Sequence, residues 1–113
     1  MSNRYITESI ADDLVMGKNV ILVSPWRTEN QYVFKEVQRL IPAERIAKVR
    51  PTSGRESIEL TNGGRLRIAP ATTTALRGFS ADTVVVLGWR ELPGDVQQSI
   101  IPVVASNGEL IRL

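Results

Sequence analysis

Some segments of this chain have apolar residues at helical spacing, and others have continuous apolar runs typical of buried strands. The two kinds of segment alternate along the chain, which predicts an α/β fold. Within residues 3–17, Ile6, Ile10 and Leu14 recur at every fourth position, and this spacing predicts a helix with one buried face. Residues 19–24 form an almost unbroken apolar run, which is typical of a strand buried on both faces of a parallel sheet. The chain is therefore predicted to start with a helix that leads into a central strand.

A second amphipathic helix is predicted over about 28–40, where Val33 and Val37 mark the buried face. Thr28 and Gln31 have the spacing of a capping box, in which each side chain bonds a free amide at the helix start. We therefore expect the helix to begin beside Thr28.

Alternating apolar and polar residues on both sides of Asn62-Gly63-Gly64 predict a β-hairpin over 57–69. A two-residue turn would place Leu60 opposite Arg65, whereas a three-residue loop keeps each face of the hairpin uniform and is therefore favoured. In the favoured register Leu60 faces Leu66, Ile58 faces Ile68 and Glu59 faces Arg67, and Gly64 is the left-handed bulge residue.

The remaining predicted elements are short strands at 46–50 and 83–87, a helix at 94–101, a turn at Asn107-Gly108 and a final strand at 110–113. The whole pattern predicts a three-layer α/β fold with a short, mostly parallel sheet, to which the hairpin is appended.

The amino-acid composition excludes several classes of function but does not identify one. The 113 residues are expected to form a single domain, 1–113, that is long enough to bury a core. The absence of Cys and His excludes disulfides, thiol nucleophiles, the usual zinc sites and histidine acid–base catalysis. The sequence also has no paired carboxylates at useful spacing and no glycine-rich phosphate cradle, so we expect no metal and no cofactor. No signal peptide or membrane-spanning run is visible, so a cytoplasmic protein is expected, in the host cell if a phage encodes it. The net charge is only +2, but most of the cations are Arg, which favours an anionic partner.

Residues 76–93 resemble the segment around the second nucleotide motif, Walker B, of phage large terminases and related helicase-type ATPases. The shared features are Leu76-Arg77-Gly78, then Ser80 and Asp82, then an apolar strand, with Pro93 beyond it. Ser24-Pro25 and the Asn62-Gly63 hairpin occur where that family has similar motifs, and the predicted order of elements matches its early core. The resemblance implies a P-loop ATPase-type scaffold.

The departures from the family imply that the scaffold has lost its chemistry. In the family an Asp-Glu pair follows the strand, holds magnesium and orients the attacking water, but this chain has Leu87-Gly88 there. No G-x-x-x-x-G-K-[ST] phosphate loop is present, so the loop and the first strand of the core are expected to be missing. We therefore expect a pseudo-ATPase that does not hydrolyse ATP, and an ordinary surface role for Glu91.

The resemblance also implies an open sheet edge. In the family the strand matching 110–113 pairs with the phosphate-loop strand, so loss of the latter would leave 110–113 free to pair with a protein partner or a second copy. The predicted edge residues are Glu109, Leu110, Ile111, Arg112 and Leu113.

Two functions follow from these expectations. The first is a non-catalytic, phage-type domain that binds nucleic acid, with base stacking by Trp26 and phosphate contacts from six cations. These are Arg27, Lys35, Arg39, Arg65, Arg67 and Arg77. The alternative is a protein-interaction module, without nucleic-acid affinity, that docks on a motor or host protein through the open edge and Trp89. Packing of Trp26 over the sheet end, and ordinary solvation or ion pairing of the cations, remain open alternatives.

Overall fold

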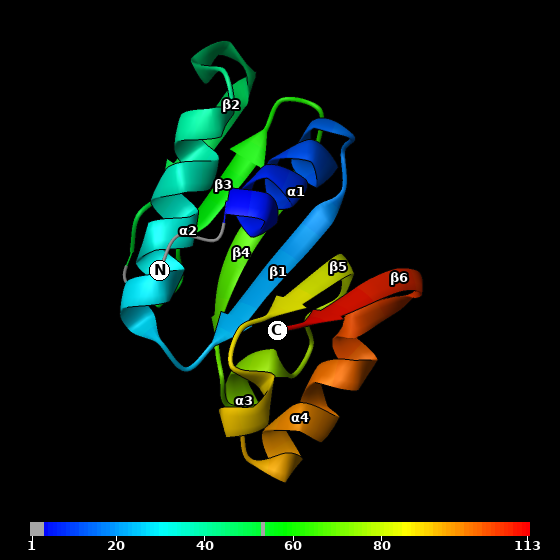
Figure 1. Cartoon of the computed structure of the whole chain (residues 1–113). Coiled ribbons are helices and arrows are strands. Elements are labelled where there is room, and N and C mark those ends of the chain that lie inside the picture. Colours follow the sequence, from blue (N-terminus) through cyan, green and yellow to red (C-terminus); the bar gives the residue numbers. More distant parts are fainter. Residues whose placement is uncertain (1–3, 53) are drawn as a thin grey trace.

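The computed structural model describes residues 4–52 and 54–113, which form one six-stranded mixed sheet with helices on both faces (Figure 1). The strands lie in the order β2-β3-β4-β1-β5-β6. The elements are α1 (Arg4–Val15), β1 (Asn19–Ser24), α2 (Arg27–Leu40), β2 (Ile46–Arg50), β3 (Ser57–Leu60), β4 (Arg65–Pro70), α3 (Thr73–Leu76), β5 (Ala81–Val86), α4 (Gly94–Ile100) and β6 (Val104–Arg112). Single turns of 3-10 helix occur at η1 (Ala43–Arg45), η2 (Trp89–Glu91) and η3 (Ile101–Val103).

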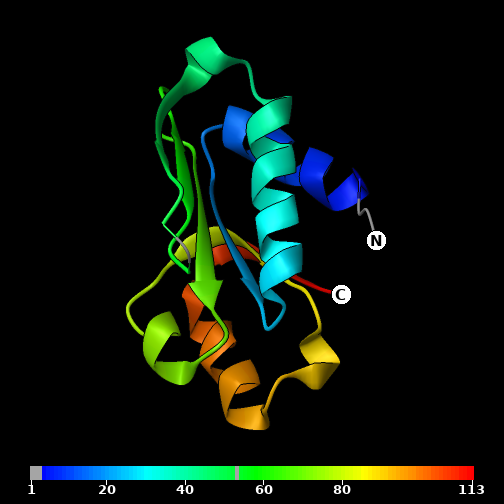
Figure 2. The same ribbon diagram turned by 90° about the vertical axis from the view of Figure 1, so that its left-hand side faces the viewer.

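The central strand β1 explains the layering. Successive side chains of a strand point to opposite faces, and here Val20 and Leu22 pack under α1 and α2, whereas Ile21 and Val23 pack against α3 and α4. Figure 2 shows α1 and α2 together on one side of the sheet. The predicted three-layer α/β fold is confirmed, and it has two hydrophobic cores.

The sheet has a parallel and an antiparallel part. Strands β4, β1, β5 and β6 are parallel neighbours, whereas β2 pairs with β3, and β3 with β4, in antiparallel fashion. The predicted strand at 46–50 therefore turns the hairpin into a three-stranded meander. At the other end of the sheet, β6 is the last strand among the described residues.

The hairpin exists as predicted, but its register was wrong by two residues. Ile58 faces Leu66 rather than Ile68, and Glu59 faces Arg65 rather than Arg67. Each face is uniform and the loop has three residues, 61–63, both as expected; the Leu60 amide closes the loop by donating to the Gly64 carbonyl over 2.8 Å. The left-handed residue is Gly63, at φ +92°, not Gly64.

The register is set by contact between the hairpin loop and the end of α1. The side-chain amide of Asn62 donates to the carbonyls of Leu14 (3.2 Å) and Val15 (2.8 Å), which have no partner within the helix. The Asn62 carbonyl oxygen accepts from the Gly64 amide over 2.8 Å. A Cβ at Gly64 would lie 2.2 Å from the Leu14 carbonyl oxygen, so Gly64 is required by close approach rather than by its φ angle.

Local signals also failed at the start of α2. The helix begins at Arg27, with Trp26 as its N-cap and no side-chain cap, so the predicted capping box at Thr28 and Gln31 does not form. The turn before the helix is held instead by Ser24, whose hydroxyl accepts from the Trp26 amide over 2.9 Å.

The predicted turn at Asn107-Gly108 is instead part of β6, which runs continuously through it. The pairing of β6 with β5 shifts there, from Ala81 opposite Val104 to Thr83 opposite Glu109. A Cβ at Gly108 would lie 2.6 Å from the Asp82 carbonyl oxygen, so glycine permits this irregularity.

The final strand, expected at 110–113, is β6, which begins six residues earlier, at Val104, and ends at Arg112. The remaining predicted elements occur within two residues of their expected bounds. The strand expected at 83–87 is 81–86, the helix expected at 94–101 ends at Ile100, and the first helix is seen over 4–15, while residue 3 lies outside the described residues. No helix in the described part of the chain is long and apolar enough to cross a bilayer.

Gly64→Ala is expected to lower the free energy of unfolding by about 1–3 kcal/mol, because the loop must move away from α1. Urea denaturation measures the change. Gly94→Ala is the matched control, since a Cβ at that position would have no atom within 4 Å, and it should change stability by about 0.5 kcal/mol or less. Equal losses in the two variants would contradict the docking argument.

Candidate functional site

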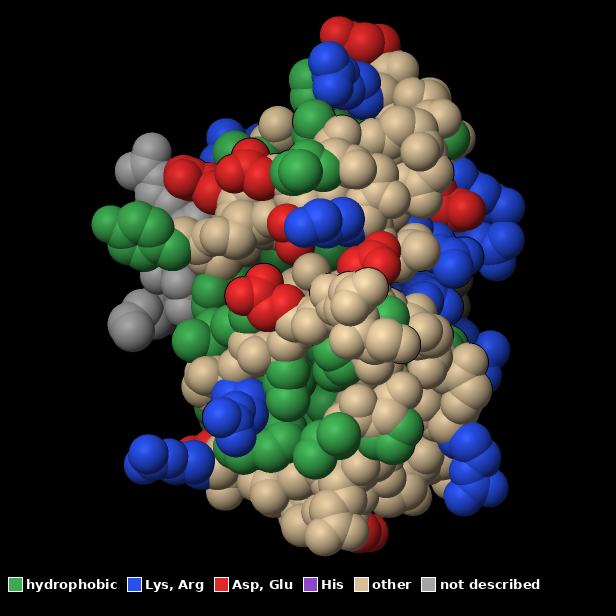
Figure 3. All heavy atoms as spheres, turned by 90° about the vertical axis from the view of Figure 1, so that its right-hand side faces the viewer, with side chains coloured by type: hydrophobic (Ala, Val, Ile, Leu, Met, Phe, Trp, Pro, Cys, Tyr) green, Lys and Arg blue, Asp and Glu red, His purple; other side chains and the backbone are tan. Residues whose placement is uncertain are grey.

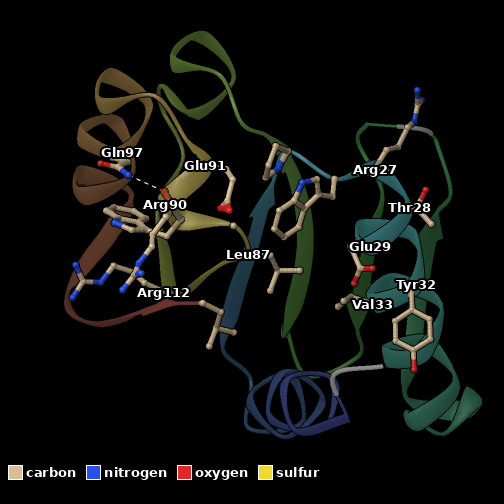
Figure 4. Close-up of a pocket in the computed structure, with 15 residues that line it drawn as sticks. Arg27, Thr28, Glu29, Tyr32, Val33, Leu87, Arg90, Glu91, Gln97 and Arg112 are labelled. Carbon is tan, nitrogen blue, oxygen red and sulfur yellow. Dashed lines mark hydrogen bonds between the residues drawn. The ribbon is translucent and has the colours of Figure 1, made fainter. Parts of the chain in front are cut away.

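An open cleft of about 1460 Å³ lies at the carboxyl ends of β1, β5 and β6 (Figure 4). In open α/β sheets this edge is the usual place for a ligand. Figure 4 shows Glu29 and Tyr32 of α2 on one side, and Arg90, Gln97 and Arg112 on the other. Among the described residues, no three acidic side chains come close enough together to hold a metal ion.

The two positions that hold acids in the resembled family carry no acid and are closely packed. The Leu87 side chain is buried, and its amide donates to the Val23 carbonyl over 2.9 Å. Gly88 adopts a left-handed conformation, at φ +69° and ψ +37°. A Cβ at Gly88 would lie 2.8 Å from the Cη2 atom of Trp26, so the indole ring covers this glycine. The packing of Trp26 over the sheet end is thereby confirmed, although 44% of the residue remains exposed.

The opposite wall of the cleft is held by contacts around Trp89. Its amide donates to the Leu113 carbonyl over 3.1 Å, and its own carbonyl accepts from the Gln97 side chain over 2.7 Å. The guanidinium of Arg112 lies 5.5 Å from the centre of the Trp89 ring, within cation–π range. Trp89 therefore connects η2, α4 and the end of β6.

A second surface lies on the face of β2, β3 and β4 that points away from α2. Because Ile58 and Leu66 are buried under α2, their neighbours along each strand point to the opposite face. The register places two rows of side chains there, Lys48–Glu59–Arg65 and Arg50–Ser57–Arg67. We name these six residues the open sheet face. Figure 3 shows Lys and Arg side chains gathered along the right-hand margin of the molecule.

Arg67 is the most constrained cation on the open sheet face. Its guanidinium lies 4.9 Å from the centre of the Phe79 ring, and its Nη2 atom donates to the Ser80 carbonyl over 3.1 Å. Its buried Nε atom has no hydrogen-bond partner in the described part of the chain. Burial lowers the pKa of Arg67, and the neighbouring positive charge of Arg65 lowers it further. The predicted Glu59–Arg67 pair was wrong, since Glu59 lies opposite Arg65.

The seven predicted nucleic-acid residues do not form one surface. Trp26 and Arg27 line the cleft, and Arg77 is exposed at the end of α3. Lys35 and Arg39 are exposed on α2, on the other side of the sheet from Arg65 and Arg67; Arg39 is bonded to Glu36 over 2.9 Å, which lowers the pKa of that carboxyl.

The structure brings Arg65 and Arg67 together and adds three cations that the sequence analysis missed. Lys48 and Arg50 are two residues apart on β2, and Arg55 lies in the connection that leads to β3. The alternation of Lys48 and Arg50 within a predicted strand was the signal available, but only the pairing of β2 with β3 puts them on the same face as Arg65 and Arg67.

The parallel strands, the helices on both faces and the cleft at the carboxyl edge define a three-layer α/β fold, which is consistent with the core of P-loop NTPase-like proteins. A solved chain that this protein resembles is a mutant of the large terminase ATPase domain of Thermus phage P74-26, with a TM-score of 0.57 and 14% sequence identity. The match covers 93% of this chain and 51% of that one, so this chain spans about half the length of its structural neighbour. No protein-family model and no curated protein matches the sequence. The predicted terminase-like fold is confirmed, whereas the loss of catalytic function stays a prediction.

Gly88→Ala is expected to destabilise the protein more than Gly78→Ala. Both glycines have positive φ angles, but no atom lies within 4 Å of the Cβ position at Gly78, so that variant measures the left-handed strain alone, about 1 kcal/mol. The excess at Gly88, about 1 kcal/mol, should disappear when Trp26→Ala is added, as tested by a double-mutant cycle in urea. Simple additivity of the Gly88 and Trp26 changes would contradict the ring contact.

Proposed function

We propose that this chain is a terminase-like domain that binds nucleic acid without hydrolysing ATP. The observation that carries the proposal is the open sheet face, where four cations surround a single acid, Glu59. Nucleic acids are bound largely through their phosphates, and Arg forms forked hydrogen bonds to phosphate oxygens. A cationic strand surface suits such a backbone because it offers several contacts at regular spacing.

The absence of hydrolysis is proposed from the carboxyl edge of the sheet. Neither Leu87 nor Gly88 can hold magnesium or orient a water molecule, and the Trp26 ring fills the space beside Gly88 into which a side chain would extend. Replacing Gly88 by an acid would therefore require Trp26 to move.

Salt dependence tests the nucleic-acid proposal. Fluorescence anisotropy of labelled duplex DNA should show binding that weakens steeply as salt rises, with a slope of log K against log salt of about −3 to −4 for four phosphate contacts. ATP hydrolysis, followed by phosphate release with and without DNA, should stay at the buffer rate. Lack of DNA binding at about 50 mM salt, or a slope near zero, would overturn the proposal.

A second candidate, protein interaction through β6, is favoured by the place of that strand at the end of the described sheet. The Leu113 amide donates to the Val86 carbonyl and its own carbonyl accepts from Trp89, so both backbone groups of Leu113 face the β5 side. Backbone groups alternate in direction along a strand, so those of Arg112 face away from β5 and could bond a strand of a second copy.

Arg112→Pro tests pairing through this edge. It removes an outward N–H, which edge strands tolerate, whereas the control Arg112→Ala removes the side chain and keeps the N–H. If two copies pair along β6, sedimentation velocity should show that the Pro variant dissociates at higher concentration than the Ala variant. A wild-type protein that stays monomeric at millimolar concentration would exclude such self-pairing.

A further inference from the structure

A hollow of about 530 Å³ opens on the far side of β3 and β4 from α2, beside α3. Its charged lining consists of Arg50, Arg55, Arg65, Arg67, Glu56 and Glu59, and we name it the basic hollow. Three of the four arginines belong to the open sheet face, and the fourth, Arg55, comes from the connection before β3. Four arginines set against two glutamates leave a local charge of +2.

Arg67 is prearranged inside this hollow. Its stacking on Phe79 and its bond to the Ser80 carbonyl fix the plane of the guanidinium, so little side-chain freedom remains to be lost on binding. The contacts it makes are to a ring and a carbonyl, which leave its charge uncancelled. A half-buried cation in this state is costly unless an opposite charge comes close.

The acids of the basic hollow do not supply that opposite charge to Arg67. Glu59 lies opposite Arg65 in the adjoining strand. Glu56 is only 5% exposed, and its buried Oε1 atom accepts no hydrogen bond from the described residues. The charge that acts on Arg67 most strongly is the positive one of Arg65, which lowers the Arg67 pKa in the same direction as burial does.

We propose that the basic hollow is a phosphate-binding site in which Arg67 provides the fixed guanidinium and Arg55 and Arg65 close around the bound group. Arginine suits phosphate because its planar fork matches two phosphate oxygens. The assignment of that phosphate to a nucleic-acid backbone rests on the proposed function. The Phe79 ring is partly buried against the core beneath α3 and α4, and Arg67 stacks on it, so we assign it no base-stacking role. The recognition proposed here is of the backbone and independent of base sequence.

The test uses the double variant Arg55→Gln/Arg65→Gln, which leaves the Arg67 contacts intact. The matched control is Arg45→Gln/Arg90→Gln, which removes two exposed cations located outside the hollow. In the DNA anisotropy assay the hollow variant should bind roughly tenfold or more weakly, with a salt slope smaller by about 2, for duplexes of unrelated sequence alike. The control should retain the wild-type slope to within about 0.5.

Inorganic phosphate serves as a second probe that needs no nucleic acid. Its addition should shift the NMR signals of the Arg67 Nε–H and the Ser80 amide in the wild type, and the shifts should be lost in the hollow variant. Arg67→Lys, checked for folding by circular dichroism, keeps the charge but loses the fork, and should weaken both probes.

The outcomes distinguish two hypotheses, that the basic hollow binds phosphate and that this phosphate belongs to a nucleic acid. DNA binding that falls only in the hollow variant supports both. DNA binding that is equal in the hollow and control variants overturns the phosphate site and leaves the proposed function standing. Phosphate shifts without DNA binding support the site and overturn nucleic acid as the source. The absence of both signals overturns the inference.

Discussion

Burial of the parallel strands on both faces is the constraint on which the rest of the structure depends. The side chains from Val20 to Val23 are fully buried, so helices must cover the sheet on both sides. The two helical layers cover different parts of the sheet, however. The core beneath α1 and α2 includes residues of β2 and β3, whereas the core against α3 and α4 includes none. Among the described residues, no helix covers β2 and β3 on this face, and polar and charged residues occupy it for that reason.

Because of this arrangement, most of the residues that stabilise the sheet are not the residues at its carboxyl edge where a ligand would bind. The strand β5 is buried through Val84, Val85 and Val86, before the positions that carry acids in the resembled family are reached. At those two positions this chain has Leu87, which is buried in the core, and Gly88, on which the Trp26 ring packs. The described fold therefore needs no acid at these two positions. Under the proposed function, the working surface is the face that the helices leave open.

The sequence was sufficient for elements whose signal is long and repeated, such as the apolar run of β1 and the four-residue spacing of α1. It failed where a contact from a distant segment overrides a local rule. The hairpin register depends on Asn62 bonding to the end of α1, and the path of β6 through Gly108 depends on the Asp82 carbonyl. Prediction of the candidate site failed for the same reason. Lys48 and Arg50 lie on the same face as Arg65 only because β2 pairs with β3, and the sequence did not reveal that pairing.

The distribution of charge explains why the amino-acid composition gave little indication of this positively charged surface. The net charge of the whole chain is +2, which by itself suggests weak attraction for anions. The basic hollow alone carries four arginines and two glutamates, so its local charge equals that of the whole protein and the remainder of the chain sums to zero. At physiological salt, charges act over about 8 Å. A phosphate that approaches the basic hollow is therefore attracted by the local charge of the hollow, and the net charge of the whole chain matters less. The fold gathers on one face four arginines that are separate in the 113-residue sequence.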